Sequence, residues 1–184
     1  MTTLSNRGKT ALMVIDVQNG VVPDAYNLDA VLANINVAVA KAREAGIPVI
    51  WVQHSDSEMP IDSDAWQIVE QLSPQSTDSF VRKLYPGSFE GTDLESILQG
   101  LQISHLVITG MQTNNCVRHT THSALDRGYD VTFVTDAHTT TSYSWNGHTV
   151  DAKNLVDEAN DNLGGQVLPG RSSRGVSAAA LTFA

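Results

Sequence analysis

Four short runs of aliphatic and β-branched residues recur along the chain with almost no alternation between apolar and polar positions. The runs are Ala11–Ile15, Pro48–Val52, Leu106–Thr109 and Val131–Thr135. Strands that are covered on both faces have this composition, whereas a strand with one solvated face alternates. The runs therefore predict the central strands of a parallel sheet flanked by helices.

Segments with helical periodicity lie between these runs. The clearest, Leu28–Ala45, carries an apolar stripe at helical spacing and is followed by Gly46, a typical C-terminal stop. Three further helices are expected at Asp93–Leu101, Asn114–Arg127 and Val150–Asn162. This alternation predicts one doubly wound α/β/α domain over residues 1–184, three layers deep, with a mostly parallel sheet of about six strands.

The tail from Gln166 onward has a less regular pattern. Its LPGRSSRG stretch is expected to break any regular element, and the VSAAALTF stretch fits either an edge strand or a packed extension.

Charge and composition narrow the class of partner. Acidic residues outnumber basic ones 20 to 11, for a net charge of −9, and lysine and arginine form no cluster. We therefore expect no nucleic acid and no membrane as partner, but a small molecule or further copies of the chain. One cysteine cannot form an internal disulfide, and the polar start MTTLSNRGK lacks the apolar core of a signal peptide. These features predict a cytoplasmic protein.

Ligands of open α/β sheets bind beyond the carboxyl ends of the strands, and three reactive residues fall there. Asp16 ends the first run, where partial burial would raise its pKa and suit it to proton transfer. Lys83 lies in a short β-like piece, FVRKLYPGSF, and Cys116 lies at the start of the third expected helix. Unpaired N–H groups and the macrodipole at a helix start favour a thiolate, as would a neighbouring lysine.

Each of these residues also has a plainer interpretation. An isolated cysteine packs as a small hydrophobe, an aspartate caps a turn, and a lysine is a solvated surface charge. The catalytic interpretation depends on all three meeting in the fold.

The segments around the three residues resemble the isochorismatase-like cysteine hydrolases. The resemblance is carried by VIDVQNG, VRKLYPGSFEGTDLESIL and LVITGMQTNNCVRHTTHSALDRGYDVTFVTDA, in that order, from about Thr10 to Ala137. It implies a catalytic triad in which Asp16 takes the thiol proton and later activates water, Lys83 tunes the pair, and Cys116 attacks. It also implies a cis peptide bond between Met111 and Gln112.

The reaction implied by the resemblance is hydrolysis of a small amide, imide or ureido compound through a thioester. The backbone N–H groups of Gln112 and Cys116 would form the oxyanion hole. Members of this family are commonly dimers or larger assemblies, so the resemblance also implies a homo-oligomer.

Departures from the family pattern exclude some activities. Metal-dependent relatives that cleave pyridine carboxamides carry an Asp-x-His motif, but Val52 stands here at the aspartate position, in WVQHSD. We therefore expect no metal and no other cofactor, with His54 and Asp56 free to contact substrate or water. His119 and His122 are spaced to share a metal but lack a recognisable third ligand.

Relatives that cleave the vinyl ether of isochorismate lack the nucleophilic cysteine, so Cys116 disfavours that activity.

Substrate choice is expected to depend on polar and aromatic side chains near the strand ends. The candidates are Gln18, Asn19, His54, Tyr85, Phe89, Asn115, His119, Tyr143 and Trp145. Of these, Tyr143 and Trp145 would form a lid or reach a neighbouring subunit.

Three alternative functions stay open. The first is a non-catalytic oligomeric small-molecule-binding protein with the same fold, and the second is an isochorismatase-type vinyl ether hydrolase, which Cys116 disfavours. The third is a thiol redox sensor, which usually needs a resolving cysteine that this chain lacks. The sequence determines neither the substrate nor the number of subunits.

Overall fold

A mostly parallel sheet organises the chain, whose computed structural model describes residues 2–183. Its strands are β1 (Lys9–Ile15), β2 (Val49–His54), β3 (Ser79–Lys83), β4 (Ile103–Met111), β5 (Asp130–Thr139), β8 (Val167–Leu168) and β9 (Arg171–Val176). Their order in the seven-stranded sheet is β3-β2-β1-β4-β5-β9-β8. Neighbours from β3 to β9 pair in parallel, and only the short β8 pairs antiparallel among the described strands of this sheet. The predicted sheet of about six mostly parallel strands is confirmed.

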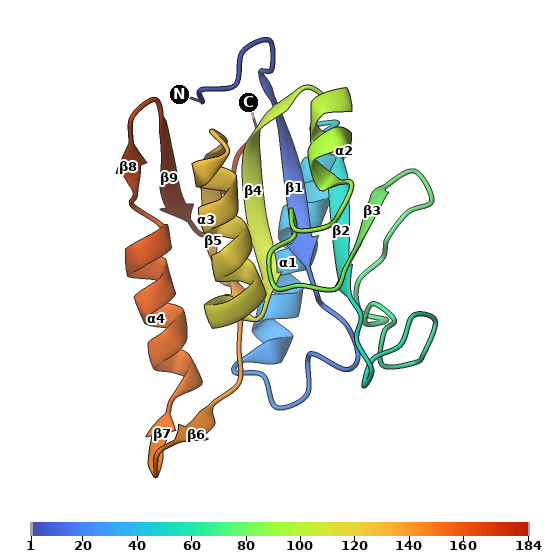
Figure 1. The fold of residues 1–184 in the computed structure, drawn as a ribbon, viewed down its shortest axis with the longest axis vertical. Helices are drawn as coiled ribbons and strands as arrows, with labels where there is room; N and C mark the ends of the chain where they lie inside the picture. Colours follow the sequence, from blue (N-terminus) through green and yellow to red (C-terminus); the bar gives the residue numbers. More distant parts are fainter. Residues whose placement is uncertain (1, 184) are drawn as a thin grey trace.

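Helices cover both faces of the sheet. They are α1 (Leu28–Glu44), α2 (Leu94–Gly100), α3 (Arg118–Asp126) and α4 (Ala152–Leu163). In Figure 1, α1 lies behind the sheet, and α2, α3 and α4 lie in front of it. This arrangement is the predicted three-layer fold.

Side chains of β1 show why the central strands are apolar throughout. Met13 and Ile15 belong to the core beneath α2, α3 and α4, whereas Leu12 and Val14 pack in the core beneath α1. Because successive residues of a strand point to opposite faces, a strand between two cores must be apolar at every position.

Two expectations from the sequence need correction. The third helix was expected as one element over Asn114–Arg127, but it is a π-helical turn, η1 (Thr113–Val117), followed by α3. The stretch LPGRSSRG does not break the sheet, because its residues from Arg171 onward belong to β9 (Arg171–Val176), which pairs with β5. Pairing uses backbone groups, so a polar segment can join a sheet near its edge without the apolar pattern of a central strand.

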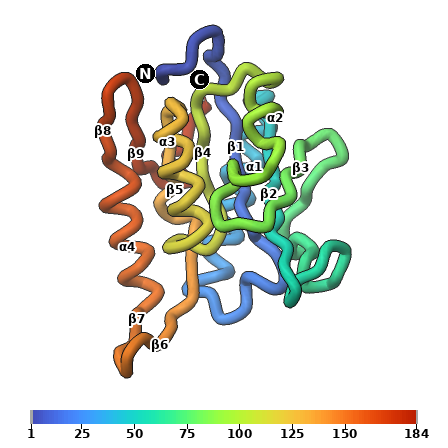
Figure 2. Tube along the Cα trace, in the orientation of Figure 1, coloured from blue at the N-terminus to red at the C-terminus, as the bar shows by residue number. Residues whose placement is uncertain are grey.

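A small hairpin projects from the end of the sheet toward which the parallel strands point. It consists of β6 (Tyr143–Trp145) and β7 (His148–Val150), and it follows β5 directly. Figure 2 shows it at the opposite end of the molecule from both chain termini. Its side chains are exposed apart from Val150, which is partly buried.

The end of the chain is held against α1 by one lysine. Lys41 Nζ donates hydrogen bonds to the carbonyl oxygens of Ala178, Ala179 and Leu181, at 3.0, 2.6 and 2.9 Å. Ala178 and Leu181 are buried in the core beneath α1, so the VSAAALTF stretch is a packed extension after its first residue, Val176, which ends β9. A cation satisfies the free carbonyl groups at the end of such a turn and interacts favourably with their dipoles.

Lys41→Met should weaken the attachment of this extension. The variant keeps the apolar stem of the side chain but leaves three carbonyl oxygens without their charged donor, which should lower the free energy of unfolding by about 1–2 kcal/mol. Urea unfolding measures the change. Lys153→Met is the matched control, because Lys153 forms only an exposed ion pair with Asp157 on α4, and its unfolding midpoint should barely move. Equal midpoints for the two variants would contradict the role of Lys41.

Candidate active site

The structure brings Asp16, Lys83 and Cys116 together at the carboxyl ends of the strands. Asp16 directly follows β1, Lys83 is the last residue of β3, and Cys116 lies in η1. Lys83 Nζ lies 2.7 Å from Asp16 Oδ2 and 3.3 Å from Cys116 Sγ. Both charged residues are only 1% exposed. A buried ammonium thus contacts a buried carboxylate and a thiol at once.

Local backbone geometry places the aspartate. Asp16 has a left-handed conformation, with φ 50°, which aspartate tolerates better than most residues. Its N–H donates to the Val52 carbonyl oxygen at 2.9 Å, which fixes it against β2. Beside it, Gly110 has φ 117°, and a Cβ there would lie 2.1 Å from the Ile15 carbonyl oxygen. Only glycine therefore lets β4 approach β1 at this point.

The turn that carries the cysteine begins directly after β4. Val117 N–H donates to the Gln112 carbonyl oxygen at 3.2 Å, an i to i−5 bond that makes η1 a π-helical turn. The preceding Met111–Gln112 peptide bond is cis. Single π-helical turns next to α-helices are frequent at functional sites, and this one places Cys116 two residues before α3 begins.

The thiol is more strongly protonated than its place at a helix start predicted. Burial and the Asp16 carboxylate raise the pKa of Cys116 to about 12, although Lys83 acts to lower it. Burial also raises the pKa of Asp16, and Lys83 opposes that shift. The sequence-based prediction of a depressed thiol pKa is therefore wrong in direction, because desolvation and a neighbouring negative charge outweigh the lysine.

One oxygen of Asp16 is placed to accept a proton. Oδ1 is buried and lacks a hydrogen-bond partner among the described residues, whereas Oδ2 contacts Lys83. A thiol and a carboxylate that share one lysine form a coupled pair, in which the proton can pass from sulfur to oxygen as the sulfur reacts.

The pair opens into a cavity of about 450 Å³. Its lining residues are Asp16, Gly20, Val21, His54, Asp56, Glu58, Met59, Pro86, Gln112, Asn115 and Cys116. A cavity of this volume accommodates a small molecule. Of the expected substrate-binding residues, His54 and Asn115 are among those that line it.

Two of the expected substrate-binding residues have structural roles instead. Gln18 is fully buried, and its side-chain amide bonds the backbone of His54 and the Trp66 carbonyl oxygen. Phe89 is 8% exposed, and its ring packs in a tilted arrangement against Tyr129 in the core, with the ring centroids 5.8 Å apart. Both lie outside the cavity lining because their side chains point into the protein interior.

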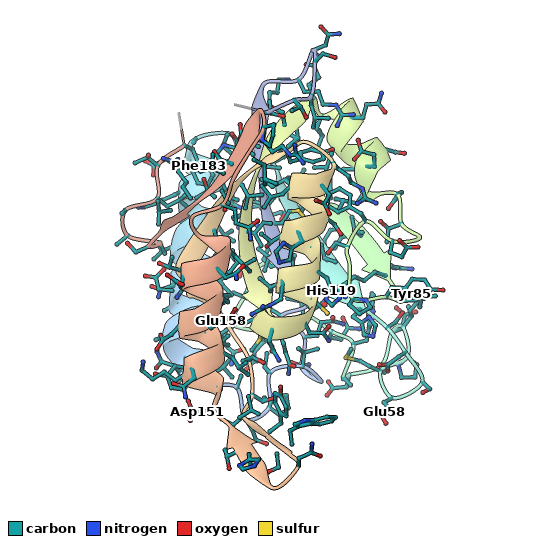
Figure 3. The ribbon with its side chains drawn as sticks, turned by 60° about the vertical axis from the view of Figure 1, so that its left-hand side comes forward. Glu58, Tyr85, His119, Asp151, Glu158 and Phe183 are labelled. Atoms are coloured by element: carbon teal, nitrogen blue, oxygen red, sulfur yellow. The ribbon has the colours of Figure 1, made fainter. Side chains whose placement is uncertain are left out.

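The other expected contacts lie around the site rather than in it. Asn19 donates to the Asp64 carbonyl oxygen, and the His119 ring contacts the Asn115 carbonyl oxygen. Figure 3 shows Tyr85 at the outer edge of the molecule, and its side chain is half exposed. Tyr143 and Trp145 are exposed on the β6–β7 hairpin, and their role in a lid or subunit contact stays a prediction.

Sequence reasoning missed several residues of the loop after β2. Asp56 was considered, but Glu58 and Met59 were not, and all three line the cavity. Asp56 Oδ1 accepts hydrogen bonds from the N–H groups of Glu58 and Met59, at 2.9 and 2.8 Å, which closes the loop into a compact turn. The rule that ligands bind beyond strand ends applies to this loop as well and would have identified it.

Within residues 2–183, no three histidine, cysteine, aspartate or glutamate side chains gather as a set of metal ligands. His54 Nε2 lies 3.3 Å from Asp56 Oδ2, which is an ion-pair distance when the imidazole is protonated. Over the same residues, no helix has both the length and the apolar character that crossing a bilayer requires.

A buried histidine that the sequence did not single out ties η1, the turn that carries Cys116, to α4. His138 Nε2 lies 2.9 Å from Asn160 Oδ1, and His138 Nδ1 lies 2.8 Å from Thr113 Oγ1. The Asn160 amide nitrogen donates to the Thr135 carbonyl oxygen, so its oxygen faces the ring and Nε2 carries the imidazole proton. Thr113 therefore donates to Nδ1, and burial lowers the pKa of His138 to about 4. The first residue of η1 is thus held by a neutral imidazole.

His138 should make stability depend on pH. Below pH 6.5 the unfolded chain binds a proton at this position that the folded chain excludes down to about pH 4. This contribution should lower the free energy of unfolding as the pH falls, by about 2 kcal/mol between pH 7.5 and pH 5, and should change little above pH 7.5. His138→Gln should abolish this component. Urea unfolding of both proteins at pH 7.5 and pH 5 measures the difference.

His148→Gln, which removes an exposed imidazole on β7, is the control for the loss of one histidine. A His138→Gln variant that loses as much stability as the wild type between pH 7.5 and pH 5 would contradict a neutral buried imidazole.

Comparison with known proteins gives the family. The model of the Isochorismatase domain matches residues 10–166. The isochorismatase family protein YddQ of Bacillus subtilis is 31% identical over 156 residues, covering 79% of this chain and 86% of YddQ. The ureidoacrylate amidohydrolase RutB of Klebsiella pneumoniae (strain 342) is 30% identical over 154 residues, covering 61% of this chain and 65% of RutB.

A solved structure agrees with this match. The isochorismatase of Pseudomonas putida KT2440 superimposes with a TM-score of 0.83 at 25% identity, over 95% of this chain and 92% of that chain. The sheet order, the site at the strand ends and the match over residues 10–166 lead to one conclusion: the chain belongs to the isochorismatase family.

Proposed function

We propose that this protein is a cysteine-dependent hydrolase that cleaves a C–N bond of a small amide, imide or ureido compound through a thioester. The observation that carries the proposal is the buried Lys83, which contacts both Asp16 and Cys116 beside the cavity. Similarity to RutB, named a ureidoacrylate amidohydrolase, supports amide or ureido chemistry.

The first half of the reaction forms the thioester. As Cys116 Sγ attacks the carbonyl carbon, its proton passes to Asp16, and the carbonyl oxygen becomes an oxyanion. The N–H groups of Gln112 and Cys116 stabilise that oxyanion. Asp16 then gives the proton to the leaving nitrogen, the C–N bond breaks, and ammonia or an amine departs.

The second half consumes the thioester. A water molecule gives one proton to Asp16 as its oxygen attacks the acyl carbon, and the C–S bond breaks. Asp16 returns that proton to the sulfur, and the carboxylic acid product leaves. Asp16 thus carries one proton at a time through both halves, so neither the base nor the nucleophile is consumed.

Lys83 explains how a thiol with a raised pKa can act as the nucleophile. Negative charge moves from Asp16 to sulfur during attack, and the Lys83 ammonium contacts both groups, so it stabilises the charge at either end of the transfer. The scheme needs no metal, and the carboxylate at which metal-dependent relatives bind theirs is replaced here by Val52, buried in β2.

Cys116→Ala should abolish turnover without unfolding the protein. A panel of small primary amides, ureido compounds and cyclic imides is assayed for release of ammonia or acid, and intact mass measurement detects the acylated cysteine. We expect at least a ~1000-fold loss of activity, because nucleophile and base act as a unit. Ser144→Ala, on the exposed β6 strand, is the control and should keep full activity. A non-catalytic binding protein would bind members of this panel and release no product.

Removing the charge of Asp16 and removing that of Lys83 should shift the pKa of Cys116 in opposite directions. Since the Asp16 carboxylate raises this pKa and Lys83 lowers it, Asp16→Asn should lower the pH at which iodoacetamide labels the cysteine, and Lys83→Met should raise it. Asp16→Asn should nevertheless lose turnover, because the proton acceptor is gone. With a single cysteine in the chain, total label uptake reports on Cys116 alone. Labelling profiles that shift in the same direction for both variants would exclude this charge arrangement.

A further inference from the structure

The cavity beside Cys116 carries an unbalanced negative charge. Three carboxylates line it, those of Asp16, Asp56 and Glu58. Among the described residues that line it, none is a lysine or an arginine. The charge of the cavity is therefore set by how many of these carboxylates have a cation of their own.

The inner carboxylate is balanced and does not contribute. Asp16 and Cys116 together carry one negative charge, whichever of them holds the shared proton, and the Lys83 ammonium 2.7 Å from Asp16 cancels it. Lys83 is 1% exposed, and both its contacts are used within this group. It is thus not available as a docking cation for a substrate carboxylate.

The outer carboxylates are not balanced in the same way. Asp56 is held in place by two backbone N–H groups, and these hydrogen bonds lower its pKa, so it is ionised at neutral pH. Glu58 is exposed at the mouth of the cavity, where Figure 3 shows it at the lower edge of the molecule. His54, when protonated, would cancel one of these two charges without reversing the sign.

Cavity size makes these charges effective on any bound molecule. A cavity of about 450 Å³ is roughly 10 Å across, only slightly more than the Debye length of about 8 Å at physiological ionic strength, so salt weakens the field of the two carboxylates inside it without removing it. The net charge of −9 for the whole chain adds an unfavourable long-range field for anions.

We propose that this site selects acyl compounds whose remote end is cationic or neutral and rejects those that carry a carboxylate, with Asp56 and Glu58 as the residues that determine this selectivity. The inference rests on the proposed function, since it names the substrate class of that same site. Ureidoacrylate, the compound in the name of the relative RutB, is a carboxylate, so this chain would differ from that relative in substrate charge.

Charged thiol reagents test the selectivity without knowledge of the substrate. Cys116 is modified separately with a cationic reagent, 2-(trimethylammonium)ethyl methanethiosulfonate, and an anionic one, 2-sulfonatoethyl methanethiosulfonate. The ratio of the two rate constants, cationic to anionic, is compared with the same ratio for a free thiol, N-acetylcysteinamide. We expect the cationic reagent to be favoured more strongly at Cys116 than at the free thiol. Glu58→Gln should reduce the cation-to-anion ratio by about five-fold, and Asp56→Asn, which keeps the acceptor of the turn, by a similar factor.

Glu44→Gln is the matched control. It removes the same charge from the C-terminal end of α1, which lies at the opposite edge of the sheet, and should leave the ratio unchanged. A wild-type ratio at or below that of the free thiol, or a ratio that is the same in the Asp56→Asn and Glu58→Gln double variant, would overturn the proposal.

A matched amide series separates this inference from the proposed function. 4-Aminobutanamide, pentanamide and succinamate are close in size and present a cationic, neutral and anionic remote group. We expect kcat/KM to decrease in that order and to converge in the double variant. The proposed function fails if no amide, imide or ureido compound of the wider panel acylates wild-type Cys116. Preferential turnover of succinamate would instead support the proposed hydrolase activity and refute the selectivity.

Discussion

The ammonium of Lys83 is the group on which the rest of the site depends. A buried charge without a partner is strongly unfavourable, and Lys83 is 1% exposed, so its place in the interior requires the Asp16 carboxylate at 2.7 Å. That contact in turn requires β3 to lie parallel to β2 and β1, because only then do Lys83 and Asp16 reach the same edge of the sheet. The strand order of the sheet and the charge balance of the site therefore depend on each other. Loss of either partner would leave a buried charge uncompensated as well as removing a reactive group.

The same burial determines how the nucleophile is generated. The cysteine is partly buried and a carboxylate lies beside its sulfur, so Cys116 rests as a thiol, with a pKa of about 12. A resting thiol is a poor target for oxidants and adventitious electrophiles, which react with the thiolate. In the proposed reaction, the thiol becomes reactive when a bound carbonyl lets its proton move to Asp16 and negative charge move to the sulfur, which Lys83 contacts. Thr113, held by the neutral His138, fixes the start of the turn that carries this sulfur.

The central part of the fold could be predicted from the sequence because β1 lies between two cores and is apolar at every inward position. Strand β9 could not, since it pairs through backbone groups and its segment is polar. The three reactive residues could be located from their places at strand ends, and by the family resemblance. The direction of the thiol pKa shift could not, because it depends on how deeply the sulfur is buried and on the distance to Asp16. Gln18 and Phe89 fall near strand ends as expected of binding residues, but position along the chain does not say whether a side chain points into the cavity or into the core.

The residues proposed for catalysis and those proposed for substrate choice belong to different kinds of structure in this protein. Asp16 and Lys83 are fixed by strands and by each other, so a change at either one disturbs the buried charge balance and the fold around it. Glu58 belongs to a loop whose turn is closed by the Asp56 side chain and the backbone, and its own carboxylate is exposed. A substitution at Glu58 therefore alters the potential in the cavity without burying or exposing apolar surface, and should cost little stability. Under the proposed selectivity, the loop residues can therefore vary while the buried groups stay in place. A shared fold and a shared set of buried groups would then be compatible with different substrates.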